Sequence, residues 1–334
     1  MIRQLLITFI VLTASLNAAS RAEKLIKNPD SWFSSDEGKK AMKCILSWQS
    51  DHGDWPKNKD TTSEPYSGDR SKLRGTFDNG ATIGELRVLA RAFQLTKDTC
   101  FEKAFHVGFD HILKAQYPNG GWPQYFPLRK GYYTHITFND SCMIRLMEFL
   151  IETATSEDYV FLDKDRRAGA QSAFDHGVDC IVKCQIKVKD TLTVWCAQHD
   201  EDTLAPADAR SYELASLSGA ESAGILTFLM KLDKPTPEVI RAVKAGVAWF
   251  DSSKVEGIRI DKIDGDRKVI ADATAPPLWG RFYDIKTNRP FFCDRDGVVK
   301  YELAAIGKER RNGYSWYGNG GEKVAKAFAK WAHR

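Results

Sequence analysis

An eight-residue phrase occurs twice in this chain, as QSDHGDWP at residues 49–56 and as QYPNGGWP at residues 116–123. Both copies have the pattern Gln-x3-Gly-x-Trp-Pro, and each follows a stretch with the apolar spacing of a helix. Downstream of each copy comes a phenylalanine with an aspartate and an asparagine, FDN at residues 77–79 and FND at residues 138–140. An internal repeat of this kind predicts a fold built from similar units that pack side by side.

The repeat unit is predicted to be a pair of helices. Three helical patterns each end on a glutamine and a fourth occupies the next repeat position: 36–49, 98–116, 167–185 and 236–250. A long loop and a second apolar helix follow each of them, and the second helices are expected at 81–96, 141–155, 216–232 and 321–333. Because one hairpin cannot bury its apolar face alone, the four predict an all-α fold, an (α/α) toroid or incomplete barrel. Its long loops, with short β-hairpins at 258–271 and 291–301, emerge at one end, where we expect the site.

Length and composition bound the class of protein. The chain has 334 residues, of which 43% are hydrophobic and 28% charged, with a formal net charge of +4. No low-complexity run or Pro/Ser-rich linker divides the chain, which predicts one domain over residues 23–334, and we expect a monomer. The mild charge predicts no nucleic-acid partner, because a nucleic-acid binder would carry a basic stripe. Seven cysteines in this length do not indicate a disulfide scaffold, and their odd number leaves at least one thiol without a partner in the chain. Cys180 and Cys184, four residues apart on a predicted helix, are expected to be buried free thiols.

The first 22 residues predict an export signal. Arg3 gives a positive start, residues 5–16 are hydrophobic or small, and Ala18, Ala19 and Ala22 offer cleavage sites. The apolar stretch is too short to span a membrane. We therefore expect a secreted or periplasmic protein without a membrane anchor in its mature form.

Aspartate and asparagine side chains precede the second helices of the first two repeats. They are Asp78 and Asn79 in the first repeat, and Asn139 and Asp140 in the second. Helix N-capping is one interpretation, although it accounts for one such residue per helix rather than a pair. A calcium site is the other, because Ca²⁺ prefers oxygen ligands from several segments.

Three arginines lie in the later loops, namely Arg210, Arg281 and Arg295. The guanidinium group suits the recognition of carboxylates, so one interpretation is an acidic ligand bound at the loop end. The acidic residues of the same loops could equally be their salt-bridge partners. The spacing leaves both interpretations open.

Several motifs in the same order resemble the pectate lyases of polysaccharide lyase family ten. They are the repeated phrase and residues 77–82, 138–140, 195–200, 212–213, 280–284 and 293–297. The resemblance covers residues 25–334 and implies an (α/α) toroid that cleaves polygalacturonate by β-elimination with Ca²⁺, giving 4,5-unsaturated oligogalacturonides.

The resemblance also implies roles for individual residues. Arg295 would be the catalytic base that takes the C5 proton. The calcium ligands would be Asp78, Asn79 and Asp140. Substrate would be bound by Arg210, Arg281, Glu213 and His199. An ordinary arginine is too basic to be neutral near pH 7, so this chemistry predicts an alkaline optimum.

Two other functions fit the same residues. An inverting glycosidase of the same fold would use Asp78 and Asp140 as general acid and base on an acidic polysaccharide, without a metal. A non-catalytic uronate-binding protein would use the arginines and loop aromatics for recognition only. A chelator and the ultraviolet absorbance of an unsaturated product separate these from the lyase.

Overall fold

The computed structural model describes residues 20–332. Most of the expected leader lies outside this range, which leaves Ser20, Arg21 and Ala22 as its described residues. These three belong to the folded body: Ser20 caps the short helix α1 (Arg21–Lys24), and Ala22 is fully buried. No helix among the described residues is long and apolar enough to cross a membrane.

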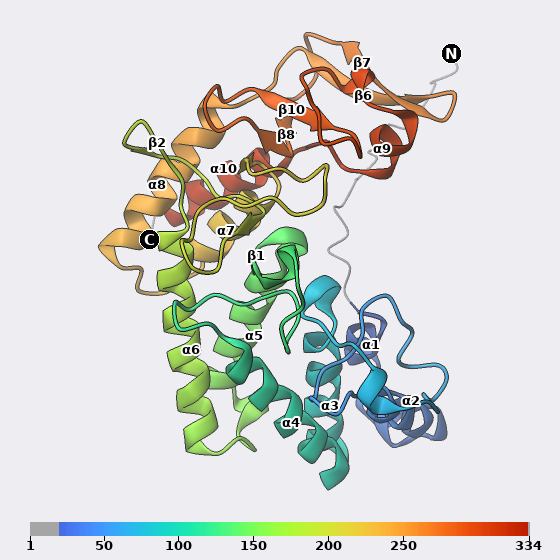
Figure 1. Cartoon of the computed structure of the whole chain (residues 1–334). Coiled ribbons are helices and arrows are strands. Elements are labelled where there is room, and N and C mark those ends of the chain that lie inside the picture. The colour runs from blue at the N-terminus through green and yellow to red at the C-terminus, as the bar shows by residue number, and fades with distance from the viewer. Residues whose placement is uncertain (1–19, 333–334) are drawn as a thin grey trace, which may run out of the picture.

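The main helices form two neighbouring rows (Figure 1). The first helices of the hairpins are α2 (Asp36–Ser47), α4 (Thr99–Ala115), α6 (Lys164–Lys183) and α8 (Pro237–Ser252). The second helices are α3 (Ile83–Thr96), α5 (Cys142–Thr155), α7 (Glu221–Leu229) and α10 (Gly320–Trp331). Contacts run along the rows, from α4 to α6 to α8 and from α3 through α5 and α7 to α10. The helices thus follow the predicted order, but the most extensive helix contacts, α3 with α4 and α5 with α6, join the second helix of one predicted pair to the first helix of the next.

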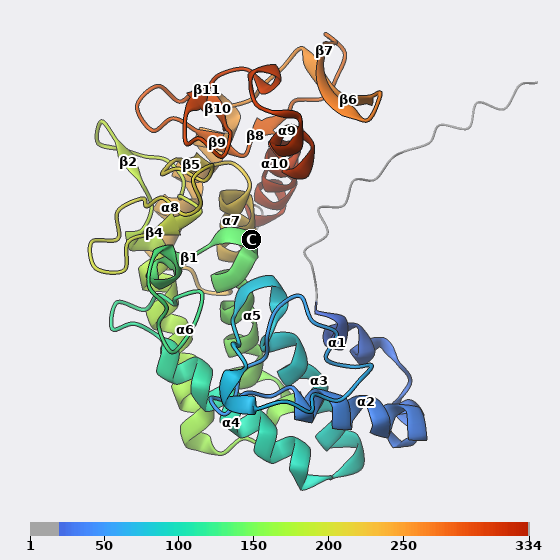
Figure 2. The same cartoon turned by 45° about the vertical axis from the view of Figure 1, so that its right-hand side comes forward.

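Closure into a toroid is not confirmed. The last helix, α10, packs against α7 and α8, and within residues 20–332 it has no extensive contact with α1, α2 or α3. Figures 1 and 2 show the first and last hairpins at opposite ends of the rows. The observed architecture is a helix-rich, open arrangement of hairpins, and a closed ring stays a prediction.

Side chains of the repeated phrase tie neighbouring hairpins together. Each repeat glutamine donates from its amide to its own loop and to the first helix of the next hairpin: Gln49 to Gly53 and Ala104, Gln116 to Gly120 and Ala173, and Gln185 to Thr193 and Ala242. The tryptophans are fully buried and donate their indole N–H to the preceding helix: Trp55 to Ile45, Trp122 to Ile112, and Trp195 to Ile181. The phrase thus sets the spacing of the hairpins. Gln185 and Trp195 make the same contacts in a third repeat.

Helix capping differs between the two rows. The first helices have ordinary side-chain caps, from Ser35, Asp98, Asp163 and Thr236. The second helices have no side-chain cap, and their N-cap residues are Thr82, Ser141, Ala220 and Asn319. The capping interpretation of the Asp and Asn pairs is therefore wrong, because none of these four side chains caps a helix.

Short strands link the loops at one end of the hairpins, in the upper part of Figure 1. β1 (Ile136–Thr137) pairs with β4 (Gln198–His199), and β8 (Trp279–Gly280) pairs with β12 (Tyr317–Gly318). A four-stranded sheet has the order β11 (Val299–Lys300), β10 (Pro290–Cys293), β9 (Phe282–Tyr283) and β5 (Leu217–Ser218). Two hairpins, β2 (Lys187–Val188) with β3 (Thr191–Leu192) and β6 (Ile258–Ile263) with β7 (Asp266–Ala271), and helix α9 (Lys308–Gly313) complete this end.

The helix predicted at 216–232 is shorter than expected. Residues 217 and 218 form β5, which pairs with β9 of the last loop, so the helix begins only at Glu221. Tertiary pairing has overridden the local apolar spacing here, and it connects the third loop to the fourth.

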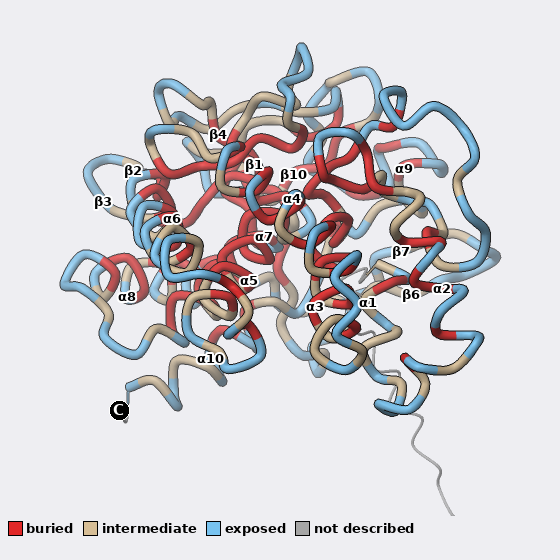
Figure 3. Tube along the Cα trace, turned by 90° about the horizontal axis from the view of Figure 1, so that it is seen from below, coloured by how far each residue is buried: buried red, intermediate tan, exposed pale blue. Residues whose placement is uncertain are grey.

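Two apolar clusters underlie this arrangement. The larger one fills the space between the two helix rows, where Figure 3 shows the buried segments gathered at the centre. The smaller one lies beneath the strand-rich end and includes Tyr212, Phe282, Phe292 and Trp316. All seven cysteines are free and all but Cys100 are buried, which confirms the expectation for Cys180 and Cys184.

Candidate active site

The two acidic motifs form the same backbone turn. Residues 78–80 and 139–141 are short 3-10 turns, η4 (Asp78–Gly80) and η6 (Asn139–Ser141), and the two turns contact each other. In each, the residue after the first polar one is left-handed, with φ of 55° at Asn79 and 52° at Asp140. Asparagine and aspartate tolerate this conformation better than most residues. The repeat therefore places its two polar pairs side by side.

Asp78 is buried beside a lysine. Its side chain is 4% exposed, one carboxylate oxygen accepts from the Lys57 ammonium, and Gln124 Nε2 donates to that same oxygen at 2.7 Å. The other oxygen, Oδ1, is buried without a hydrogen-bond partner. Burial would lower the pKa of Lys57, but the Asp78 carboxylate raises it overall. Asp78 thus keeps one carboxylate oxygen available for a further positive group.

Asp140 lies between an arginine and several carboxylates. Arg281 Nη2 is 3.8 Å from Asp140 Oδ1. The same nitrogen donates to Asn139 Oδ1 at 3.0 Å and pairs with Glu221 at 2.6 Å. Burial raises the pKa of Asp140; Arg281 opposes this shift, and the negative charges of Glu221, Asp78 and Glu213 add to it. Around Asp140 the negatively charged carboxylates therefore outnumber the one arginine that acts on it.

Arg210 and Glu213, both in the third long loop, form an ion pair. Arg210 Nε donates to Glu213 at 2.6 Å, and the second guanidinium nitrogen contacts the other carboxylate oxygen. Tyr314 OH donates to Glu213 at 2.6 Å, and the Tyr314 ring lies under the Arg281 guanidinium at 4.6 Å. Burial alone would raise the pKa of Glu213, but these two donors lower it overall. Tyr314 joins the Arg210–Glu213 pair to the surroundings of Asp140.

Arg295 lies further out. Its side chain is 63% exposed, pairs with Glu309 at 3.0 Å, and lies over the Tyr212 ring at 5.7 Å. Arg210 also lies over the Tyr212 ring, at 5.0 Å. Arg295 therefore shares an aromatic neighbour with the site, but it makes no direct contact with Asp78 or Asp140.

His199 has a structural environment. It is fully buried, its Nε2 accepts from the amide of Cys196 at 3.0 Å, and its Nδ1 lies 2.8 Å from the carbonyl of Leu204. Burial lowers the pKa of His199 to about 4, so the ring is neutral. Both ring nitrogens are used within the chain, and this geometry gives no support to a substrate contact.

Four residues of the site were not predicted from the sequence, namely Lys57, Gln124, Glu221 and Tyr314. Lys57 lies just after the first repeated phrase and Gln124 just after the second, so the repeat itself was the available signal. Glu221 begins helix α7 and Tyr314 follows α9. No local pattern distinguishes these last two from ordinary surface residues.

The residues around the two turns fit a hard cation. The available donors are carboxylate and amide oxygens, which Ca²⁺ prefers, and Asp78 Oδ1 is a buried carboxylate oxygen without a partner. The carboxylates of Asp78, Glu213 and Glu221 all act on Asp140 across the site. A divalent cation would relieve this repulsion.

The chain matches the sequence model of the pectic acid lyase family over residues 49–325. That range contains the repeated phrase, both acidic turns and all three arginines. The chain belongs to the pectic acid lyase family. The resemblance seen in the sequence is thereby confirmed, and the protein is a pectate lyase.

Two solved structures support the same family. Both are of a family 10 polysaccharide lyase from Cellvibrio cellulosa, and each is 38% identical to this pectate lyase. The first has a TM-score of 0.81 and covers 92% of this chain and 97% of its own. The second, an aspartate-to-alanine mutant in complex with trigalacturonic acid, has a TM-score of 0.80 and covers 92% and 98%. No curated protein matches the sequence.

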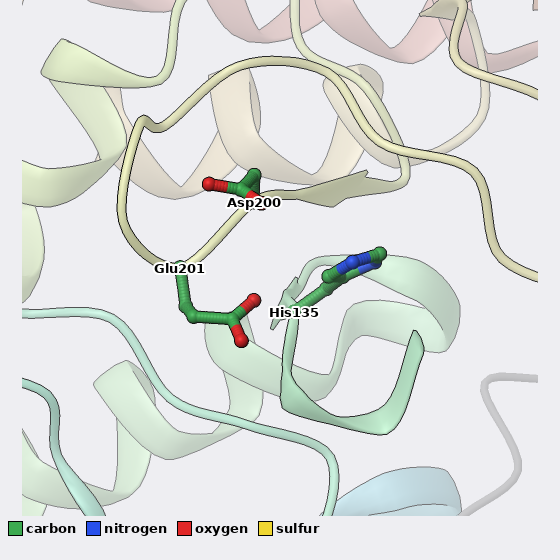
Figure 4. Close-up of side chains that lie close together, drawn as sticks. All are labelled: His135, Asp200 and Glu201. Atoms are coloured by element: carbon green, nitrogen blue, oxygen red, sulfur yellow. The ribbon is translucent and has the colours of Figure 1, made fainter. Parts of the chain in front are cut away.

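This pectate lyase has a second group of metal-binding residue types. One ligand atom each of His135, Asp200 and Glu201 lie within 4.8 Å of one another, on two adjacent loops (Figure 4). They lie at the end of the β1–β4 pair remote from Asn139. Asp200 Oδ1 already accepts from two backbone amides and the Thr203 hydroxyl. A histidine nitrogen suits a softer metal than calcium, so this group stays outside the calcium assignment.

A cavity of about 790 Å³ in this pectate lyase lies away from the acidic turns. It is lined by side chains of α5, α6, α7 and α8, among them Glu152, Phe174, Val178 and Phe228. None of the predicted site residues lines it. The chemistry is thus assigned to the loop end rather than to this cavity.

Proposed function

We propose that this pectate lyase is a secreted, calcium-dependent enzyme that cleaves α-1,4-linked polygalacturonate by β-elimination and releases 4,5-unsaturated oligogalacturonides. One observation carries the proposal: two acidic turns from separate repeats touch each other, Arg281 of the fourth loop lies beside the second turn, and Tyr314 connects Arg281 to the Arg210–Glu213 pair of the third loop. The solved relative in complex with trigalacturonic acid supports the substrate class.

The residues that would hold the calcium ion are Asp78, Asn79 and Asp140. When bound, Ca²⁺ would neutralise the uronate carboxylate and so make the neighbouring C5 proton more acidic. Arg281 suits a similar electrostatic role, because it is already anchored by Glu221 and Asn139 beside Asp140. A fixed cation at this position would stabilise the negative charge that develops when the proton leaves.

Two arginines are candidates for the base that takes the C5 proton. Arg295 is the residue implied by the motif, but it would have to leave Glu309 and approach the acidic turns. Arg210 lies nearer, one tyrosine ring from Arg281, and its only carboxylate partner among the described residues is Glu213. Acidic neighbours raise the pKa of all three arginines, so the direction of the pKa shift does not choose among them. Position therefore favours Arg210 over Arg295.

One assay tests the reaction and the assignment together. Absorbance growth on polygalacturonate is followed for wild type, Arg210→Ala, Arg281→Ala and Arg295→Ala, each with calcium and with a chelator. We expect wild type to form an absorbing product only with calcium, and the variant that lacks the base to lose on the order of a thousandfold in kcat. Reducing-sugar release without absorbance would identify a glycosidase instead. Binding without any turnover would identify a non-catalytic uronate-binding protein.

The pH profile tests the arginine base separately. The carboxylate of Glu213 raises the pKa of Arg210, and that of Glu309 raises the pKa of Arg295. The neutral, proton-accepting form of either arginine therefore grows as pH rises. We expect kcat on polygalacturonate to increase from pH 7 to pH 10 at saturating calcium. A flat profile over this range contradicts an arginine base.

For the leader, we propose cleavage on the N-terminal side of Ser20. Ser20 and Ala22 are part of the folded body, and Arg21 pairs with Asp60 at 2.5 Å, so cleavage after Ala22 would remove residues that pack and bond. Intact-mass measurement of protein recovered from the culture medium or periplasm gives the cleavage point. A mature chain that begins at Glu23 contradicts this assignment.

A further inference from the structure

Arg129 differs from the other arginines around the active site. Its guanidinium carbon lies over two tyrosine rings, 4.6 Å from the Tyr125 centroid and 4.7 Å from the Tyr133 centroid. Arg210, Arg281 and Arg295 each have a carboxylate partner. Arg129 has none among residues 20–332.

The segment that carries Arg129 is connected to both sides of the active site. Gln124 binds Asp78 through its side chain, and its backbone amide donates to the carbonyl of Tyr133 at 3.1 Å. Lys57, which pairs with Asp78, lies 5.9 Å from the centroid of the Tyr125 ring, one of the two rings that Arg129 covers. This places the Arg129 platform directly beside the first acidic turn.

Tyr132 extends the platform toward the third loop. Its ring is 4.2 Å from that of Tyr133, and the charges of Arg210 and Glu213 both act on its hydroxyl. The segment thus reaches from the surroundings of Asp78 to those of Arg210. A chain of uronate rings that passes between these groups would meet Arg129.

We propose that Arg129, held on the faces of Tyr125 and Tyr133, is a binding subsite for the carboxylate of a uronate ring next to the cleavage site. This inference rests on the proposed function. A guanidinium fork matches a carboxylate in two parallel hydrogen bonds, and aromatic faces hold it in a fixed orientation. Because Arg129 has no ion pair to break, its charge is available to an anionic ligand from the start.

The subsite is a positioning feature, so it acts on substrate binding rather than on the reaction at C5. Replacement of Arg129 by alanine should raise KM for polygalacturonate on the order of tenfold and leave kcat within about twofold. Arg129→Lys retains the charge without the fork and should lie between wild type and Arg129→Ala. Arg241→Ala removes another exposed arginine, from the first half of α8, and should change neither constant.

The measurement is steady-state kinetics of the four proteins on polygalacturonate with saturating calcium, after thermal melting has shown equal stability. An unchanged KM in Arg129→Ala, or a fall in kcat with KM unchanged, overturns the subsite. Mobility in gels that contain polygalacturonate separates this result from failure of the proposed function. If wild type binds the polymer without cleaving it, weaker retardation of Arg129→Ala still supports the subsite, and equal retardation overturns it.

Discussion

At the scale of single residues, the site contains backbone conformations and a buried carboxylate that destabilise the folded state. Asp140 is in a left-handed conformation, and the N-cap residues of α3 and α5, Thr82 and Ser141, also have positive φ, at 68° and 62°. Backbone strain of this kind costs on the order of 1–3 kcal/mol at each position. Burial and neighbouring carboxylates also raise the pKa of Asp140. The site is thus assembled for binding a cation at the expense of stability.

Asp140→Asn separates the contribution of Asp140 to cation binding from its effect on stability. The substitution removes a proposed calcium ligand, so kcat/KM on polygalacturonate should fall by at least ~100-fold. Because the raised pKa means that the folded state disfavours the charged carboxylate, the melting temperature at pH 8 without calcium should stay equal or rise.

Asp251→Asn, on the exposed end of α8, is the matched control and should change neither quantity. Loss of activity in Asp140→Asn accompanied by a marked fall in melting temperature would point to a structural role for Asp140.

At the scale of elements, the repeat glutamines connect one hairpin to the next. Gln116 donates to Gly120 in its own loop at 3.0 Å and to Ala173 of α6 at 2.8 Å. Both acceptors are backbone carbonyls, so they would be left without this donor if the side chain were shortened. The same geometry at Gln49 and Gln185 explains why the glutamine recurs at the end of the first helices.

Gln116→Ala should therefore lower the free energy of unfolding by about 2 kcal/mol, the net value of two partly buried hydrogen bonds. Urea unfolding followed by circular dichroism measures it. Gln171→Ala on α6, where the side chain bonds only to exposed Asp175, should shift the value by less than about 0.5 kcal/mol. Equal effects of the two substitutions would mean that the Gln116 bonds do not connect the hairpins.

Helix α3 contains a buried carboxyl group of a different kind. Glu85 is 2% exposed, accepts from the Thr61 hydroxyl at 3.0 Å, and has one carboxylate oxygen, Oε2, without a partner. Burial raises the pKa of Glu85 from 4.5 to about 7. The stability it contributes is complete below pH 4.5 and is lost as pH rises through about 7.

Glu85→Gln should consequently stabilise the protein above pH 7, by up to about 3 kcal/mol, and have little effect near pH 4.5. Unfolding free energies at pH 5, 7 and 9 test this dependence. A difference between the two proteins that is the same at all three values would show that Glu85 does not titrate in this range.

At the scale of the whole molecule, the site exists only when the hairpins are in register. Asp78 comes from the first loop, Asp140 from the second, Arg210 from the third and Arg281 from the fourth. Strand pairs between loops fix their relative positions: β1 with β4, and β5 with β9. The unfolded chain cannot present these groups together, so a ligand of the site binds the folded state alone.

Calcium should therefore raise the melting temperature in proportion to the logarithm of its concentration once the site is saturated. Differential scanning calorimetry with 0 and about 100 Kd of calcium should show a stabilisation of about 2.7 kcal/mol in wild type. Asp78→Asn should respond much less. A calcium response that persists in both Asp78→Asn and Asp140→Asn would place the ion elsewhere in the molecule.

The sequence by itself determined the hairpins, the turns and the chemical types at the site. Apolar spacing specifies helices locally, and the repeated phrase at residues 49–56 and 116–123 carries its own hydrogen-bonding partners. The paired motifs at 77–79 and 138–140 likewise specify identical turns. Tertiary structure alone decided which arginines meet the carboxylates, that His199 is enclosed, and that Lys57, Glu221 and Tyr314 belong to the site. These depend on contacts between loops far apart in the chain, and local sequence does not encode the partner of a charged side chain.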